Sequence, residues 1–271
     1  MNEFTRQSIE LANREVYLDR LSVVYPLNPE ANRQINEDLW KKIESDFLKN
    51  DCVEMFKTLL ELDLFPVKDS YVPFFKRVSA GAQRDIIIRN NPATVSRICN
   101  RIYELGVEKL KASVVQPKET NRQMGPLFRR WVDSGALGVV PVRDIDQFLR
   151  SDGFAILSGQ DDFLGNFART YLGWQREDKG LDFVAKVGEK FVIGEAKFIT
   201  DFGGHQNDQF LDALTTVRSQ TNPNVVKVAI MDGVLYIPNR GKLYKTTASG
   251  NYNILSALFL KDFLTTLYHN G

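Results

Sequence analysis

Two apolar runs separated by a glycine most constrain how this chain can fold: LDFVAKV over residues 181–187 and KFVIGEAKFIT over residues 190–200. Both runs are strand-like. The intervening Gly188-Glu189 suits a two-residue turn, because glycine accepts the positive φ that the first position of a type II′ turn requires. The sequence therefore predicts a β-hairpin in which residue 187 faces 190, 185 faces 192 and 182 faces 195.

In this register Asp182 and Glu195 are direct cross-strand neighbours, with Cβ atoms about 4.5–5.5 Å apart. Because strand side chains alternate between the two faces, Lys197 points to the same face as Glu195. Two carboxylates this close repel each other unless a cation lies between them, and Mg²⁺ prefers oxygen ligands. The open end of the hairpin is therefore predicted to hold a divalent cation.

Such an ion polarises a phosphoryl oxygen and lowers the pKa of a bound water. The sequence leaves three roles open for Lys197: orienting the attacking water, stabilising charge on the phosphorus oxygens, or acting as a general base. The opposing interpretation is an exposed cluster of charged side chains at a sheet edge. A second Glu-x-Lys, at residues 177–179, lies in a polar stretch and is interpreted as solvated loop.

The rest of the chain divides into a helical part and a mixed α/β part. Apolar spacings of three and four residues predict helices through most of the first hundred residues. The basic segment over residues 113–131 contains two prolines and a glycine and marks the expected boundary. We expect residues 1–115 to form a helical region for dimerisation or for embracing DNA. Residues 116–271 are expected to form a catalytic core with DNA-contacting segments.

Within this core, helices are expected over residues 160–172 and 207–220, and a last helix over residues 254–268. Two further apolar runs, at residues 225–233 and 234–238, predict strands. Asp232-Gly233 lies where they meet and is a strong signal for a hairpin turn.

The segments KGLDF and VIGEAKF resemble the motif of the PD-(D/E)xK nuclease superfamily. Asp182 matches its first metal-binding acid, Glu195 the second and Lys197 the lysine, whereas Leu181 stands where the motif has proline. The helix over 160–172, the helix after the hairpin and the strand over 225–233 match the remaining core, so the resemblance covers about residues 160–235. It implies an α/β fold with a restriction-endonuclease-like mixed sheet flanked by helices, and hydrolysis of phosphodiesters.

A free-standing chain with a large additional helical part most resembles a type II restriction endonuclease. The resemblance implies a Mg²⁺-dependent homodimer that cuts double-stranded DNA at a short specific sequence, with a cognate DNA methyltransferase as system partner. It also implies Ala196 as a metal-binding residue beside Asp182 and Glu195, and Gln209 as a further catalytic residue. Two alternatives stay open: a structure-specific repair, recombination or defence nuclease of the same fold, and a DNA-binding protein without catalysis.

The loop after the hairpin, DFGGHQNDQ, is a candidate for contacting DNA. Its two glycines allow the backbone to approach a ligand closely. The expected contacts are His205, Gln206 and Asn207, and Gln206 or Gln209 can position a phosphate or a water. The alternative is a glycine turn followed by helix capping from Asn207 or Asp208.

Two basic segments, one at the start of the core and one after its last strand, can pair with phosphates, and arginine can also bind guanine in the major groove. Ordinary solvated surface is the alternative for both. The candidates are Lys118, Arg122, Gln123, Arg129, Arg130, Arg240 and Lys242, with Glu119 as an accessory acid of the metal site.

The formal net charge of +1 predicts no partner by itself. Cys52 and Cys99 have apolar helical surroundings, and we expect two small core residues in a reducing compartment, too few for a structural zinc site of their own. No apolar stretch approaches the roughly 18 residues needed to span a bilayer. The first residues are charged and amphipathic and predict no secretory signal, so we expect a cytoplasmic protein.

Overall fold

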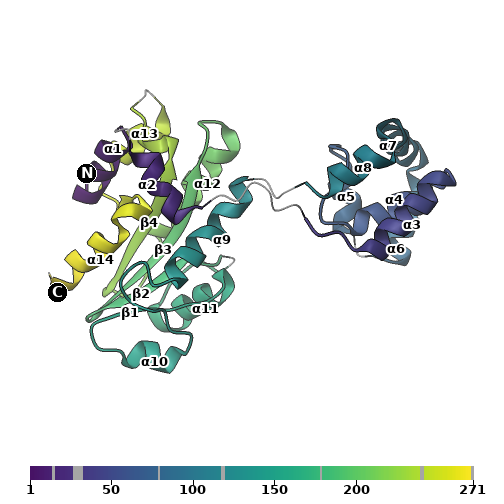
Figure 1. Cartoon of the computed structure of the whole chain (residues 1–271). Helices are drawn as coiled ribbons and strands as arrows, with labels where there is room; N and C mark the ends of the chain where they lie inside the picture. Colours follow the sequence, from purple (N-terminus) through teal and green to yellow (C-terminus); the bar gives the residue numbers. More distant parts are fainter. Residues whose placement is uncertain are drawn as a thin grey trace. The chain divides into compact units, whose positions relative to one another are not determined.

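The computed structural model describes residues 1–13, 16–26, 33–78, 80–116, 120–177, 179–238 and 241–269, apart from the side chains of residues 120–122 and 205. The chain divides into two compact units (Figure 1): one combines Met1–Leu27 with Glu119–Gly271, and the other is Asn28–Lys118. The boundary at residue 118 lies close to the expected one at residue 115. The first 27 residues, however, belong with the sheet and not with a helical region spanning residues 1–115.

The unit Asn28–Lys118 is helical. Its apolar side chains share one core, in which Ile43, Phe56 and Ile98 are fully buried. The apolar residues of this core recur on single helix faces, and this produces the spacing of three and four residues from which helices were predicted. The helices are α3 (Glu37–Leu48), α4 (Cys52–Glu61), α5 (Val72–Arg77), α6 (Ala82–Asn90), α7 (Pro92–Leu105) and α8 (Val107–Val114).

The two cysteines of this unit differ from the expectation of separate core residues. Cys52 begins α4 and Cys99 lies within α7, and the structure pairs them as a disulfide with their Cα atoms 5.8 Å apart. That separation is in the range that a disulfide requires. The two positions are 47 residues apart in the chain, so the pairing follows from the packing of α4 against α7 and not from local spacing.

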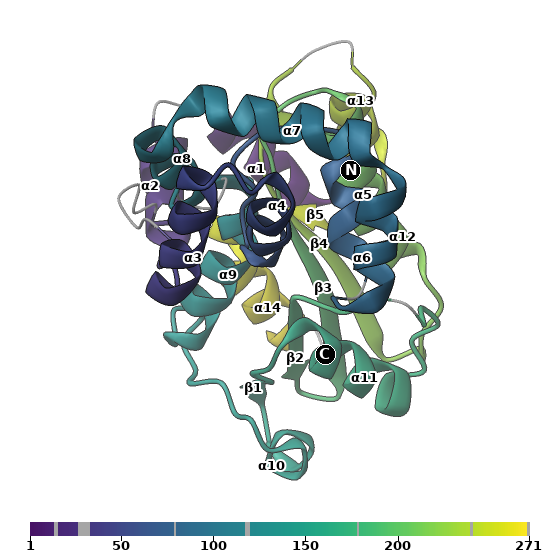
Figure 2. The same cartoon turned by 90° about the vertical axis from the view of Figure 1, so that its right-hand side faces the viewer.

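A five-stranded mixed sheet forms the centre of the other unit (Figure 2). Its order is β1 (Phe154–Ile156), β2 (Phe183–Val187), β3 (Lys190–Ile199), β4 (Val225–Gly233) and β5 (Ile254–Leu255). β2 is antiparallel to both β1 and β3, whereas β3, β4 and β5 run parallel. Parallel neighbours need a crossover connection, and α12 (Gly204–Arg218) provides it between β3 and β4. The expected α/β architecture with a mixed sheet is confirmed.

Alternation along β2 and β3 divides their side chains between two cores. Val184 and Ile193 pack with α11 (Asp161–Leu172), whereas Phe183 and Val192 belong to a larger core. The larger core also contains apolar side chains of α9 (Thr120–Asp133), α12 and α14 (Leu260–His269). The remaining helices of this unit are α1 (Glu3–Ala12), α2 (Tyr17–Val24), α10 (Ile145–Arg150), α13 (Lys242–Ser249), η1 (Val234–Tyr236) and η2 (Ala257–Phe259).

Asp232 explains why the first helices belong to this unit. It lies near the end of β4, is fully buried, and accepts hydrogen bonds from the hydroxyls of Tyr17 and Tyr25, each at 3.0 Å. Ser256 donates a third at 2.5 Å. A buried carboxylate without such donors is costly, so the aspartate holds α2 against the sheet.

The prediction of a hairpin at Asp232-Gly233 is wrong. β4 ends at Gly233 and the chain continues into the 3₁₀ helix η1, not into a strand over residues 234–238. The next strand is β5, which was expected to be part of the last helix. An Asp-Gly pair signals a turn because glycine accepts a positive φ, and Gly233 does have a φ of +101°. The pattern says nothing of burial, however, and this aspartate is enclosed by donors from distant segments. Separately, no helix in the described part of the chain is long and apolar enough to cross a membrane.

Candidate active site

The hairpin of β2 and β3 has the predicted register. Val187 pairs with Lys190, Ala185 with Val192, and Phe183 with Gly194. Gly188 has a φ of +59°, the conformation for which glycine was expected in the turn. Asp182 directly precedes β2, while Glu195 and Lys197 are two residues apart on β3. The register therefore brings the two acids and the lysine together at the open end of the hairpin.

The backbone of β3 holds the carboxylate of Asp182. Its Oδ2 atom accepts a hydrogen bond from the N–H of Ala196 at 2.9 Å. The Asp182 N–H in turn donates to the carbonyl oxygen of Gly194 at 3.1 Å. The first acid of the motif is thus attached to the two strand residues that flank the second acid.

Glu195 is buried, with only 2% of its surface exposed. Its Oε1 atom lies 2.5 Å from Nζ of Lys197 and 3.5 Å from Nζ of Lys179. Its Oε2 atom has no hydrogen-bond partner among the described residues. Burial and the nearby charge of Asp182 raise the pKa of Glu195, and the two lysines oppose that rise.

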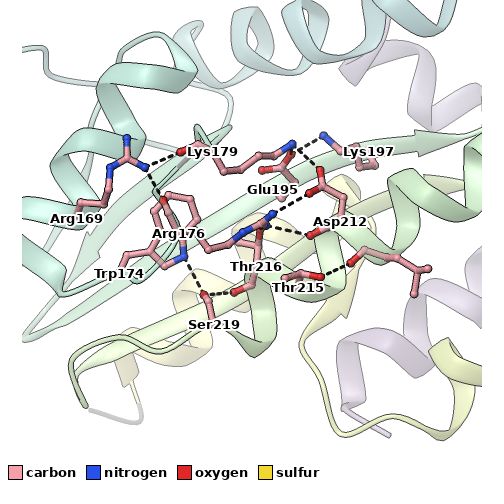
Figure 3. Close-up of polar contacts among 11 residues, drawn as sticks. Arg169, Trp174, Arg176, Lys179, Glu195, Lys197, Asp212, Thr215, Thr216 and Ser219 are labelled. Carbon is pink, nitrogen blue, oxygen red and sulfur yellow. Dashed lines mark hydrogen bonds and ion pairs between the residues drawn. The ribbon is translucent and has the colours of Figure 1, made fainter.

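Lys179 and Asp212 belong to this site, and sequence reasoning missed both (Figure 3). Lys179 was interpreted as solvated loop, but its Nζ lies between Glu195 and Oδ2 of Asp212, which is 2.5 Å away. Burial lowers the pKa of Lys179, but its hydrogen bond to Asp212 and the charge of Glu195 outweigh burial and leave the pKa above its usual value. Arg176 also contacts Asp212, at 3.1 Å. Burial raises the pKa of Asp212, but Lys179 and Arg176 reverse this, and the net pKa is lowered.

A sequence signal for Lys179 existed in its position three residues before Asp182, next to Gly180. Asp212 carries no comparable signal, because it is one polar residue on an amphipathic helix 17 positions after Glu195. Its role follows only from the packing of α12 along β3 and β4.

The donor set fits a divalent cation. No cluster of three or more histidine, cysteine, aspartate or glutamate side chains suitable for a metal occurs in the described residues. The charge of Asp182 nevertheless acts on Glu195, and Oε2 of Glu195 is a buried carboxylate oxygen without a donor among the described residues. Such an oxygen is costly to leave unsatisfied and is a typical ligand for Mg²⁺.

The glutamines and the asparagine expected near this site lie on α12. Gln206 is buried, and its Oε1 accepts a hydrogen bond from the backbone N–H of Thr200 at 3.1 Å, which joins the helix to the end of β3. Gln209 is half-buried and one turn before Asp212. Asn207 lies inside the helix and is half-buried. The N-cap of α12 is Gly203, and no side chain caps this helix. Capping by Asn207 or Asp208 is therefore wrong.

The candidate DNA contacts are only partly described. Lys118, Glu119 and Arg240 lie outside the described residues, as do the side chains of Arg122 and His205. Lys242 is exposed at the start of α13. The described candidates on α9 are Gln123 and Arg129, both half-buried, and Arg130, which is exposed.

Two of these arginines line a cavity of about 720 Å³ whose other lining residues include Gly159 and Phe163 at the start of α11. Arg129 and Arg130 contribute from α9, and Arg143 contributes from the segment before α10. Arg129 is 3.3 Å from Asp161 at the start of α11. A smaller adjoining cavity shares Arg129 and is lined by Asp182. Arg129 thus lines both cavities, and Asp182 lines only the smaller one.

The mixed sheet flanked by helices, with two acids and a lysine at the open end of one hairpin, defines a nuclease of the PD-(D/E)xK class. The model of the Tsp45I type II restriction enzyme family matches residues 2–267. The chain belongs to this family and is a type II restriction endonuclease, a site-specific deoxyribonuclease. No curated protein and no solved structure matches it.

Proposed function

We propose that this enzyme hydrolyses both strands of double-stranded DNA at a short sequence, with Mg²⁺ held by Asp182, Glu195 and the backbone of Ala196. The observation that carries the metal assignment is Oε2 of Glu195, a buried carboxylate oxygen with no donor among the described residues. A cation shared with Asp182 would satisfy this oxygen and relieve the repulsion between the two acids.

When bound, Mg²⁺ supplies polarisation of a phosphoryl oxygen and a water of lowered pKa. The protein side chains then have separate tasks. Asp182 and Glu195 would hold the ion, and the hydrogen bond from the N–H of Ala196 fixes the carboxylate of Asp182. Lys197 is a compact positive charge beside Glu195 that orients the attacking water or stabilises charge on the phosphate oxygens. Gln209, on α12, assists in positioning the water or the phosphate.

The arginine-lined cavity is the proposed path of the DNA backbone toward Asp182. Arg130 and Arg143 are exposed on it and can pair with phosphates. Gln123 and Arg122 are proposed to contact bases from the same helix, α9. The other proposed contacts are Lys118, Arg129, His205, Gln206, Asn207, Arg240 and Lys242.

Duplex DNA presents two strands with opposite polarity, so a twofold homodimer is the simplest arrangement that cuts both. The helices of residues 28–118 are proposed to supply dimerisation, DNA embrace or both. A cognate methyltransferase would protect the cell's own DNA, and because that DNA is the common substrate, a cytoplasmic location is proposed for both proteins. Glu119 remains a proposed accessory acid of the metal site.

Cleavage of mixed-sequence, unmethylated linear duplex DNA tests the proposal. The wild type is incubated with Mg²⁺ or with EDTA, beside Lys197→Ala and a matched control, Lys190→Ala. Lys190 is half-buried at the opposite end of the same strand. We expect discrete fragments that require Mg²⁺, a rate lowered at least about 100-fold in Lys197→Ala, and a rate within about twofold of wild type in Lys190→Ala.

Other outcomes would overturn parts of the proposal. A smear of fragments contradicts sequence specificity, and a preference for branched or nicked DNA indicates a structure-specific nuclease. Binding without cleavage in Mg²⁺ indicates a non-catalytic DNA-binding protein. Undiminished cleavage by Lys197→Ala removes Lys197 from the mechanism.

A further inference from the structure

The described residues of the loop between α11 and β2 are hydrogen-bonded to α11 and to the C-terminal end of α12 (Figure 3). Arg169 of α11 donates to the carbonyl oxygens of Arg176 and Lys179, each at 2.7 Å. The indole N–H of Trp174 donates to Oγ of Ser219, just after α12, at 2.8 Å. The loop therefore has hydrogen bonds on two sides, which is unlike the solvated segment expected from its polar sequence.

Two glycines bring this loop into close contact with α11. A Cβ atom at Gly165 would lie 2.7 Å from the carbonyl oxygen of Lys179, and a Cβ atom at Gly180 would lie 2.6 Å from the backbone of Asp161. Any side chain at either position would displace the loop, because protein interiors are close-packed. The backbone of Lys179 is thus positioned by tight packing as well as by Arg169.

From this backbone position the side chain of Lys179 reaches two carboxylates. Its Nζ lies 2.5 Å from Oδ2 of Asp212 and 3.5 Å from Oε1 of Glu195. Asp212 is itself fixed by Arg176, whose other guanidinium nitrogen donates to Oγ1 of Thr216 at 2.8 Å. Asp212 therefore holds Lys179 beside the acid that is proposed to bind the metal.

The charges of this cluster balance without a metal ion. Glu195 already has two lysine partners on Oε1, so a divalent ion that binds Glu195 must compete with both positive charges. Lys179 differs from a simple competitor, because Asp212 offers it a second carboxylate. The cluster has three carboxylates and three positive side chains. The carboxylates are those of Asp182, Glu195 and Asp212, and the positive side chains are those of Arg176, Lys179 and Lys197.

We propose that Lys179 is a positioning residue that sets the affinity of the Asp182–Glu195 pair for the divalent ion, and that Asp212 sets how strongly Lys179 acts on Glu195. This inference rests on the proposed metal-dependent function. It requires opposite effects of two neutral substitutions. Lys179→Met removes a competing positive charge and strengthens metal binding, whereas Asp212→Asn removes the second carboxylate, leaves Lys179 to Glu195, and weakens metal binding.

The test measures metal affinity in two ways on the full-length protein. The dissociation constant of Mn²⁺ is determined without DNA from the electron paramagnetic resonance of the free ion. The Mg²⁺ concentration for half-maximal cleavage is determined with DNA. We expect Lys179→Met to lower both values about tenfold and Asp212→Asn to raise both about tenfold, a change of about 1.4 kcal/mol each. Lys179→Arg keeps the charge and is expected within about threefold of wild type, as is the control Lys190→Met.

A purely structural role for the loop predicts a different pattern. Both neutral substitutions would then disturb the site and weaken metal binding, and shifts in the same direction overturn the inference while wild-type cleavage leaves the proposed function intact. Unchanged affinity in both variants overturns it equally. A wild type that neither binds Mn²⁺ nor cleaves DNA overturns the proposed function itself. Thermal unfolding of each variant identifies any that fails to fold, and Lys179→Gln and Asp212→Ser then replace it.

Discussion

The carboxylate of Asp182 is hydrogen-bonded to the backbone N–H of Ala196, the residue between Glu195 and Lys197. This bond spans the end of the hairpin and fixes one oxygen of the first acid relative to the Glu-x-Lys segment. It uses only one lone pair of the carboxylate, so the acid keeps further oxygen lone pairs for a cation. The main chain therefore positions the first acid of the proposed metal site.

Asp182→Asn separates this geometric role from the role of charge. The amide oxygen of asparagine can still accept from Ala196, so we expect a melting temperature within about 3 °C of wild type. Loss of the charge is expected to lower the cleavage rate at least about 100-fold. The melting temperature is measured by thermal unfolding, and the cleavage rate is measured in Mg²⁺. Asp182→Ala serves as comparison, because it loses both the charge and the hydrogen bond, and cleavage near the wild-type rate in Asp182→Asn would show that the charge is dispensable.

The raised pKa of Glu195 predicts how metal binding depends on pH. A proton and the metal ion compete for the same carboxylate, so Mn²⁺ affinity falls as the pH is lowered toward that raised pKa. The loss begins at a higher pH than for an exposed glutamate, whose pKa is about 4.3. Dissociation constants for Mn²⁺ measured from pH 8 down to pH 4, which spans the titration of an exposed glutamate, check this. Constant affinity over the whole range would show that Glu195 is not the titrating ligand.

Arg143 tests the path proposed for DNA. If it contacts one phosphate, Arg143→Ala weakens binding of all sequences alike and reduces the slope of log affinity against log salt by about one. Arg150→Ala is the matched control, because Arg150 is an exposed arginine on α10 whose ion-pair partner is Asp146 on the same helix. Fluorescence anisotropy with a DNA duplex in EDTA, at several salt concentrations, measures both. Equal effects of the two substitutions would contradict a specific contact by Arg143.

The buried Asp232 predicts a second pH effect, on stability. Burial raises its pKa, although Ser256 and the other donors oppose this. Between its unfolded pKa, about 3.9, and the higher folded value, the native protein binds the extra proton, so the contribution of Asp232 to the free energy of unfolding rises as the pH falls. Urea unfolding of wild type and Asp232→Asn at several pH values isolates this difference. If the free energies of unfolding of wild type and Asp232→Asn differed by the same amount at every pH, a raised pKa of Asp232 would be contradicted.

Tyr17→Phe tests how α2 is attached to the sheet. The substitution removes a buried hydroxyl that donates to Asp232 and accepts from the N–H of Gly233, both at 3.0 Å. We expect the free energy of unfolding to fall by about 1–3 kcal/mol, because the carboxylate loses a donor in a buried site. Tyr268→Phe, at an exposed tyrosine of α14, is the control and is expected to change it by less than about 0.5 kcal/mol. Equal effects would show that the Tyr17 bond is not stabilising.

The separate core of residues 28–118 predicts that this unit folds alone. A fragment over residues 33–116 is expected to unfold cooperatively, because its apolar side chains pack in a core of their own. Removal of residues 1–25 from the full chain is expected to destabilise the sheet unit, since Tyr17 and Tyr25 would be lost from Asp232. Circular dichroism during urea unfolding measures both. A fragment without a cooperative transition would show that its core depends on the rest of the chain.

The sequence was sufficient for the hairpin, its register and the position of Asp182 opposite the Glu-x-Lys segment. These features depend on strand periodicity and on a glycine turn, both of which act over a few residues. It was also sufficient for the helical character of residues 33–116, because apolar spacing reports one face of a helix. The same local rules misassigned Asp232-Gly233 as a hairpin, since a turn signal carries no information on burial.

The sequence by itself therefore determined the class of fold and the residues of the acid–acid–lysine motif. Only the tertiary structure decided that Lys179 and Asp212 join that site, that Asp232 binds α2, and that Cys52 meets Cys99. Each of these contacts joins segments far apart in the chain. Their free energies depend on burial and on distances between packed elements, which residue spacing along the sequence does not specify.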